Sequence, residues 1–193
     1  METVFIEGKT FDKSDFTKSP LMNGEYENCI FINCDFSNTS LLEIRFVDCE
    51  FIGCNLSLAN LTKTAFRDIK FKDCKMLGLH FENCHPFGLS FSFDNCNLSH
   101  SSFFQTKLKK TIFKKSQLTE VDFAESDLAG CLFENCDLAK AIFENTIIEK
   151  ADFRTSFNYS IDPEINRIKK AKFSLPNVVG LLNKYDIEID RIN

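Results

Sequence analysis

The chain has 193 residues, a formal net charge of −5, and 22 phenylalanines with no tryptophan. This modestly acidic balance argues against a general nucleic-acid-binding protein, which is usually basic, and no apolar run approaches the roughly 18 residues that a membrane span needs. Residues 1–10 lack the basic and apolar regions of a secretory signal, so we expect none. The length fits a single domain. From the charge and the short apolar runs we expect no direct contact with nucleic acid or with a membrane.

Apolar residues recur at every fifth position from early in the chain. The position two residues before each one is usually short (Ser, Thr, Ala, Gly or Cys), and the remaining positions are mostly polar. A helix has a period of about 3.6 and a strand a period of about 2. A period of five therefore predicts a stacked solenoid, in which neighbouring units bury one another's apolar residues. The apolar positions of the first half are Phe11, Phe16, Leu21, Tyr26, Phe31, Phe36, Leu41, Phe46, Phe51, Leu56, Leu61, Phe66, Phe71, Met76 and Phe81.

All nine cysteines occupy the short position of the repeat. An odd number of cysteines does not favour a disulfide framework, and zinc sites usually show C-x2-C pairs rather than the C-x4-C spacing found here. The favoured interpretation is a small buried apolar side chain, which implies reduced thiols, no metal and a cytoplasmic protein. Several cysteines recur at an interval of four repeats, which suggests four repeats per coil. The cysteines are Cys29, Cys34, Cys49, Cys54, Cys74, Cys84, Cys96, Cys131 and Cys136.

The five-residue repeat is interrupted between Phe81 and Phe93, where the apolar positions are two residues further apart than the repeat requires. We therefore expect a two-residue insertion near residues 84–91. Proline and glycine in this stretch supply turn chemistry. One interpretation is a structural bulge. The other is a recognition loop, whose candidate residues are His85, Pro86, Phe87 and Gly88.

From Phe93 the repeat runs without a miss to Phe153 and then breaks. We expect three parts: a β-helix over 1–157, an excursion with a last partial coil over 158–174, and a capping or dimerisation segment over 175–193. In this last segment, 174–184 has the pattern of a short amphipathic helix, and 185–190 alternates like an edge strand. Its apolar content favours a homodimer over a simple cap. The candidate dimer contacts are Leu175, Val178, Val179, Leu181, Leu182, Ile187 and Ile189.

The repeat resembles the pentapeptide-repeat family, in which a short residue, a polar residue, Leu or Phe, and two polar residues follow one another. Residues 34–38 (CDFSN) and 126–130 (SDLAG) are close matches, and the resemblance covers about residues 11 to 175. It implies an all-β solenoid, specifically a right-handed quadrilateral β-helix of about seven coils with Phe and Leu inside. A short C-terminal helix and strand would follow.

The tail resembles that of the quinolone-resistance (Qnr) subgroup. This resemblance implies a tail-to-tail dimer that mimics duplex DNA and binds the type II topoisomerases DNA gyrase and topoisomerase IV. Residues 120–152 contain nine acidic residues and only two lysines. This excess of negative charge would give a phosphate-like field. The candidate partner-binding residues are Glu120, Asp122, Glu125, Asp127, Glu134, Asp137 and Glu144.

Two alternatives to mimicry remain open at this point. The acids can simply solvate a β-helix surface, and the protein can be an interaction scaffold for a different partner. A basic band at Lys107, Lys109, Lys110, Lys114 and Lys115 does not suit a DNA mimic if it lies on the contact face. Catalysis is poorly supported, because no nucleophile, metal or nucleotide motif is present. We expect no enzyme activity, cofactor or small-molecule substrate.

Overall fold

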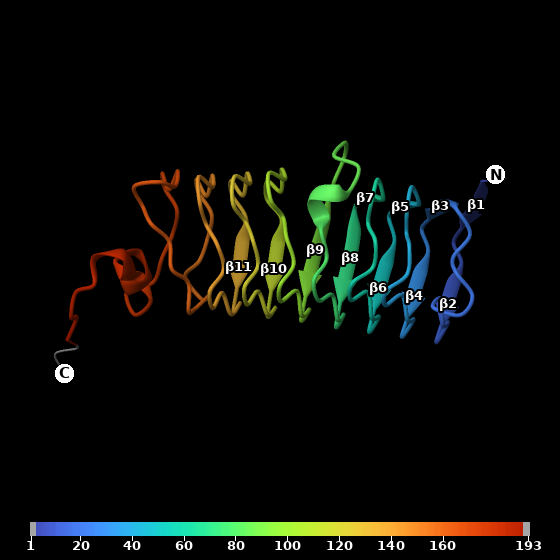
Figure 1. The fold of residues 1–193 in the computed structure, drawn as a ribbon, viewed down its shortest axis with the longest axis horizontal. Coiled ribbons are helices and arrows are strands. Elements are labelled where there is room, and N and C mark those ends of the chain that lie inside the picture. The colour runs from blue at the N-terminus through green and yellow to red at the C-terminus, as the bar shows by residue number, and fades with distance from the viewer. Residues whose placement is uncertain (1–2, 191–193) are drawn as a thin grey trace.

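The structure is a computed structural model that describes residues 3–190. The chain winds into a rod in which each turn stacks on the one before it, with the N-terminal end at one tip and the C-terminal segment at the other (Figure 1). The five-residue repeat produces this shape because each repeat supplies one inward residue and one corner, and four repeats complete a turn. We number the four sides faces 1 to 4 in the order in which the chain visits them, starting at the first strand.

Faces 1 and 2 carry two all-parallel sheets. Face 1 holds four strands and face 2 holds seven, while faces 3 and 4 consist of isolated bridges joined by turns. The face 1 strands are β1 (Val4–Glu7), β3 (Gly24–Glu27), β5 (Arg45–Val47) and β7 (Ala65–Arg67). The face 2 strands are β2 (Thr10–Asp12), β4 (Ile30–Ile32), β6 (Glu50–Ile52), β8 (Ile69–Lys72), β9 (Phe91–Asp94), β10 (Ile112–Lys114) and β11 (Leu132–Glu134).

The register of the sheets fixes the length of a coil. Phe11 pairs with Phe31 and Phe31 with Phe51, so one turn takes four of the five-residue repeats. Phe71 pairs with Phe93, so the coil between them contains the two extra residues of the insertion. The sequence-based prediction of a parallel solenoid with about seven coils and four repeats per turn is therefore confirmed.

The interior is a dry column of stacked rings and aliphatic chains. On face 2 each phenylalanine stacks on the next one, with ring centroids 4.5 to 5.4 Å apart. The nine cysteines are all free and buried beside this column, and most of their thiols donate to backbone carbonyls of the preceding coil, as Cys136 does to Phe113 at 3.3 Å. This confirms the interpretation of these cysteines as small buried groups.

The corners between faces need left-handed backbone. Asn33 (φ 52°) and Gly53 (φ 63°) occupy such corners one above the other, a conformation that asparagine and glycine adopt most easily. At most corners the second residue after the inward side chain has this conformation, and it is usually polar or glycine.

The insertion interrupts face 1 after β7. A short 3-10 helix, η1 (Phe81–Asn83), leads into it. His85 N donates to Thr64 O and Ser90 N donates to Phe66 O, so the stems of the loop pair with β7 while its middle protrudes from the rod (Figure 1). The inward residue of face 1 is missing in this coil. The buried ring of Phe91 fills part of the space, 5.3 Å from the ring of Phe81.

The C-terminal segment differs from the prediction in two respects. The expected helix forms as two 3-10 turns, η2 (Val178–Leu181) and η3 (Asn183–Tyr185), and the expected strand over 185–190 does not form, since residues 186–190 have no regular structure. A strand needs a partner edge, and no described strand lies beside this stretch. In the excursion, Asp162 Oδ1 accepts the backbone N–H of Glu164 at 2.8 Å and closes a turn.

Candidate functional site

The seven predicted acidic residues do not form one patch. Successive repeats lie on successive faces, so the structure places them around the whole rod. Asp127 lies on face 1, Glu134 on face 2 and Asp137 on face 3. The other four lie on or beside face 4, with Glu120 and Glu125 at its two corners and Asp122 and Glu144 between them. We call Glu120, Asp122, Glu125 and Glu144 the face-4 acidic row.

The acids outside face 4 are largely engaged by neighbours. Asp127 pairs with Lys109 at 3.0 Å, and Glu134 lies 3.8 Å from Lys114. Asp137 accepts hydrogen bonds from its own turn and from the side-chain amide of Asn158. Their charge is therefore partly used to hold turns and adjacent coils together.

The face-4 acidic row is less neutralised. Asp122 Oδ1 accepts a turn N–H, Glu125 accepts the side-chain amide of Gln105 at 2.7 Å, and Glu144 has no ion-pair partner among residues 3–190. Glu120 is the exception, because the Lys140 amine bonds to it at 3.1 Å and lowers the pKa of its carboxyl. Because Glu125 N donates to Glu144 O, these two residues lie on adjacent coils.

The predicted basic band lies on other faces. Three of these lysines lie on face 1, before β10 begins: Lys107, Lys109 and Lys110. The other two, Lys114 and Lys115, lie at the end of β10 on face 2 and at the corner that follows it. The five lysines of this band thus lie on faces 1 and 2, where two of them lie beside Asp127 and Glu134. They do not reach the face-4 acidic row, in which Lys140 bonds to Glu120.

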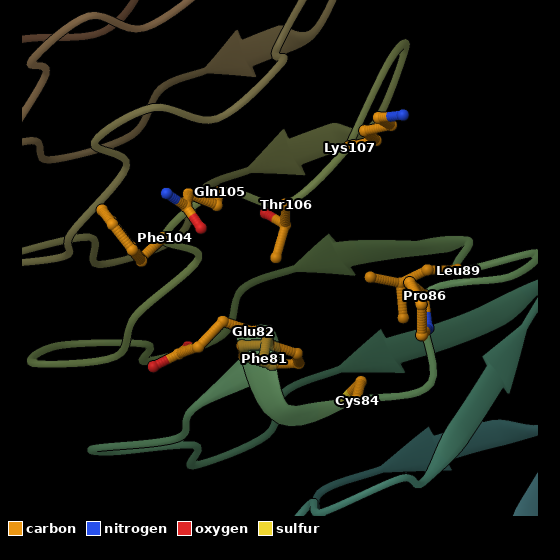
Figure 2. Close-up of a pocket in the computed structure, with 9 residues that line it drawn as sticks. All are labelled: Phe81, Glu82, Cys84, Pro86, Leu89, Phe104, Gln105, Thr106 and Lys107. Atoms are coloured by element: carbon orange, nitrogen blue, oxygen red, sulfur yellow. The ribbon is translucent and has the colours of Figure 1, made fainter.

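A hollow of about 410 Å³ lies between the insertion loop and the next coil. It exists because the chain leaves face 1 in this coil and the buried rings fill only part of the gap. Figure 2 shows Glu82 and Phe104 on one side of the hollow and Pro86 and Leu89 on the other. The lining residues are Phe81, Glu82, Cys84, Pro86, Leu89, Phe104, Gln105, Thr106 and Lys107.

The predicted recognition loop is held by an arginine of β7. The guanidinium of Arg67 lies 5.7 Å from the ring centre of Phe87, and the backbone of Gly88 packs closely on the same side chain. Phe87 is 74% exposed despite this contact. Of the four predicted loop residues, only Pro86 lines the hollow. Glu82 and Phe104 were missed because they look like ordinary outward residues of the repeat, and nothing in the linear sequence marks them.

The predicted dimer residues divide into two groups. Leu181 packs against the core, whereas Leu175, Val179, Ile187 and Ile189 are exposed at the C-terminal tip, with Leu175 at 88%. Val178 and Leu182 are half-buried. A second hollow of about 370 Å³ lies among the apolar residues of this tip, between Val179 and Ile189.

Other kinds of site find little support within residues 3–190. No group of three or more His, Cys, Asp or Glu side chains is arranged to hold a metal ion in this part of the chain. Nor does this part contain a helix with the length and apolar character needed to cross a membrane. Burial raises the pKa of thiols such as Cys49 and Cys131 to about 12, so they are poor nucleophiles.

A parallel β-solenoid of five-residue repeats with a filled interior and polar outer faces defines a class of repeat protein. Family models agree: one for a pentapeptide repeat region matches residues 24–92, and one for eight copies of pentapeptide repeats matches residues 116–154. These matches cover more than half of the chain, which belongs to the pentapeptide-repeat family. A comparison with curated proteins finds no match.

A comparison with solved structures finds the same fold in a variant of QnrB1. A trypsin-treated variant of QnrB1, described as a plasmid-mediated fluoroquinolone resistance protein, aligns with a TM-score of 0.57 and 18% identity, over 98% of this chain and 100% of that one. Full-length QnrB1 gives 0.45 and 20%, over 94% and 99%. HetL, a pentapeptide-repeat protein involved in heterocyst differentiation regulation from the cyanobacterium Nostoc sp. strain PCC 7120, gives 0.39 and 15%, over 86% and 84%.

Proposed function

We propose that the protein is a non-enzymatic DNA mimic that binds DNA gyrase or topoisomerase IV and protects the enzyme from quinolones. The observation that carries the proposal is the face-4 acidic row, in which two adjacent coils present four carboxylates on one side of the rod. A topoisomerase surface that binds DNA is basic, and a row of carboxylates offers it the field of a phosphate backbone. The shared fold with QnrB1, a fluoroquinolone resistance protein by its description, supports this choice of partner.

The charge separation around the rod orients the complex. Face 4 meets the basic surface of the partner, while the lysines of faces 1 and 2 point away from it. The opposite orientation would place those lysines against the basic surface, where like charges repel.

We further propose that two copies associate through their C-terminal tips. Exposed Leu175, Val179, Ile187 and Ile189 form an apolar surface that a second copy can cover. Replacing Val179 and Ile187 with Glu is expected to give a monomer by light scattering, and the same change at Phe5, an exposed residue at the opposite tip, is expected to leave the dimer intact. A wild-type protein that is monomeric at micromolar concentration contradicts this arrangement.

The main test neutralises face 4 without disturbing the fold. The triple variant D122N, E125Q and E144Q removes three charges while keeping side-chain shape and an acceptor for the turn at residue 122. The matched control D127N, E134Q and D137N removes three charges from the other faces. In a gyrase supercoiling assay with ciprofloxacin, we expect wild type and control to restore supercoiling and the face-4 variant to lose this effect.

Two results contradict the proposal. If the wild-type protein does not restore supercoiling at micromolar concentration, gyrase is not the partner. If the face-4 variant and the control lose equal activity, net charge matters rather than the acidic row. Thermal unfolding of all three proteins checks that each variant is folded.

A second candidate function is an interaction scaffold for a different protein. The exposed ring of Phe87 on a loop fixed by Arg67 favours it, since anchored aromatic residues are common at interfaces. Deleting residues 86–89 is then expected to remove a specific partner from a pull-down without affecting gyrase. A deletion that leaves every partner in place contradicts this function.

A further inference from the structure

A column of lysines runs along the corner between faces 1 and 2 in the C-terminal half of the rod. Three lysines and one glycine occupy this corner in successive coils, all with left-handed backbone (φ 60 to 72°): Lys110, Gly130, Lys150 and Lys170. The corner N–H of one coil donates to the carbonyl just before the next corner, as Lys150 N does to Lys169 O at 3.0 Å. The corner residues therefore stack in a line along the rod. We call the three corner lysines and the adjacent Lys169 the lysine ridge.

The positive charge of the lysine ridge is not cancelled by its neighbours. All four lysines are exposed, and none of them has an ion-pair partner among residues 3–190. The two acidic residues that flank Lys150 are each bonded to another cation. Glu149 pairs with Arg167 at 2.8 Å, and Asp152 pairs with Arg154 at 2.7 Å. Four amines are therefore left to attract an anionic ligand.

The fold itself does not require lysine at this corner. In the N-terminal half of the rod the same corner holds residues that adopt left-handed backbone more easily: Gly8, Asn28, Asp48 and Asp68. Lysine is less suited to this conformation, and a line of like charges repels itself. The corner lysines thus add strain and repulsion without forming an ion pair within residues 3–190, which indicates a role in binding.

We propose that the lysine ridge binds the phosphate backbone of a nucleic-acid duplex. From Lys110 to Lys170 the ridge spans three coils, which is about 14 Å at a strand spacing of about 4.8 Å. One strand of a B-form duplex presents about four phosphates over this length of its axis, and the ridge presents four amines. A straight line of cations suits a stiff linear polyanion more closely than a fluid lipid surface.

The proposal differs from the expectation drawn from the net charge. The value of −5 argues against contact with nucleic acid, but it averages over all four faces. The face-4 acidic row does not adjoin the corner between faces 1 and 2, so a duplex can contact the ridge without meeting the row. The inference does not depend on the proposed function, because it concerns another side of the rod.

The test measures binding of a fluorescein-labelled duplex of about 20 base pairs to the whole protein, by fluorescence anisotropy at salt concentrations from about 50 to 200 mM. Four phosphate contacts predict that the logarithm of the binding constant falls with the logarithm of salt concentration with a slope of about −3.6. Absence of binding at about 50 mM salt, or binding with a slope near zero, overturns the proposal.

Two triple variants separate the ridge from general attraction to lysines. K150Q, K169Q and K170Q together remove three ridge charges, and we expect a slope of about −0.9 and at least about tenfold weaker binding at about 50 mM salt. The matched control, K13Q with K72Q and K75Q, removes three lysines that lie off the ridge and also lack ion-pair partners among residues 3–190. We expect the slope of the wild-type protein from this control. Equal weakening by both variants overturns the ridge as the site.

A gain-of-function variant tests the same idea without removing any side chain. Gly130 is the gap in the column, and a Cβ there would lie 3.6 Å from Cγ of Lys110, an ordinary contact. Gly130→Lys adds a fifth amine, so we expect tighter binding and a slope steeper by about 0.9. Unchanged or weaker binding by a folded Gly130→Lys variant contradicts the proposal.

A parallel assay decides between a duplex and an anionic membrane. The protein is sedimented with vesicles of phosphatidylserine and phosphatidylcholine, and we expect no ridge-dependent binding. Ridge-dependent binding to vesicles without binding to the duplex overturns the choice of nucleic acid. Neither assay contains a topoisomerase, so failure here leaves the proposed function standing, and failure of gyrase protection leaves the lysine ridge standing.

Discussion

The stacked phenylalanines of face 2 predict a large and local loss of stability when one ring is removed. Phe113 lies in β10, is 0% exposed, and stacks between Phe93 and Phe133 with ring centroids 5.2 and 4.9 Å away. Both neighbours are fixed by parallel ladders in register with β10. The coils therefore cannot close the space that Phe113→Ala would leave.

The size of the effect follows from burial and stacking. Truncating a fully buried phenylalanine to alanine costs about 3 to 5 kcal/mol, and stacked aromatic pairs contribute roughly 0.5 to 1.5 kcal/mol each beyond the area they bury. Since Phe113 forms two such pairs and its site cannot collapse, we expect a loss of about 4 to 5 kcal/mol. A domain is typically stable by about 5 to 15 kcal/mol.

The free energy of unfolding is measured by urea denaturation at one protein concentration. Far-UV circular dichroism reports the transition, because the chain has no tryptophan. The control is Phe87→Ala, the same truncation at a ring that is mostly exposed, for which we expect less than about 1 kcal/mol, close to its cation–π contact. A loss below about 2 kcal/mol for Phe113→Ala, or equal losses for both variants, would refute the argument from a packed column.

Four further outcomes are expected. Cys136→Ser should change the free energy of unfolding by less than about 1 kcal/mol, because a hydroxyl can donate to the same carbonyl. In the native protein Cys136 should resist thiol reagents, since burial raises its pKa to about 11. Gly180→Ala should loosen the C-terminal segment, seen as faster amide exchange, because a Cβ there would clash with the backbone oxygen of Tyr159. Lys184 lowers the pKa of the Asp162 carboxyl. The Asp162–Lys184 pair should therefore stabilise the fold at any pH above the pKa that Asp162 has in the unfolded chain. This stabilisation should be lost as the pH falls through the lower pKa that Asp162 has in the folded protein, so the amides of this segment should exchange faster only in acid.

The fold was predictable because the repeat is strict. A five-residue period with an inward Phe or Leu leaves one way to bury those residues, and cysteines at an interval of four repeats, such as Cys34 and Cys54, indicate the length of a coil. The tail was predicted less well. Alternating Ile187 and Ile189 suggested a strand, but alternation records which side chains face the same way and not whether a partner edge is present.

The candidate site was predictable only in part, and the reason is geometric. The acidic window from position 120 to position 152 passes around the rod more than once, so acids that are close in sequence, such as Asp122 and Asp127, lie on different faces. The hollow was missed for a related reason. Glu82 and Phe104 are neighbours on face 4 of successive coils, and a hollow lies beside them because the insertion takes the chain out of face 1 in this coil.

Because successive repeats lie on different faces, the net charge of the chain is a poor guide to the surface that a partner contacts. Net charge and charge per sequence window both average over four faces, whereas a docking protein meets one of them. Neighbours on one face are separated by a whole coil of sequence, so the informative comparison is between residues such as Asp122 and Ile142 on one ladder, or Lys107 and Asp127 on another. Under the proposed function, the lysines of faces 1 and 2 mark the sides that a basic partner would avoid. Mimicry of a duplex would require phosphate-like charge only where the partner makes contact, so the face-4 acidic row, rather than the net charge of the chain, is the feature to test.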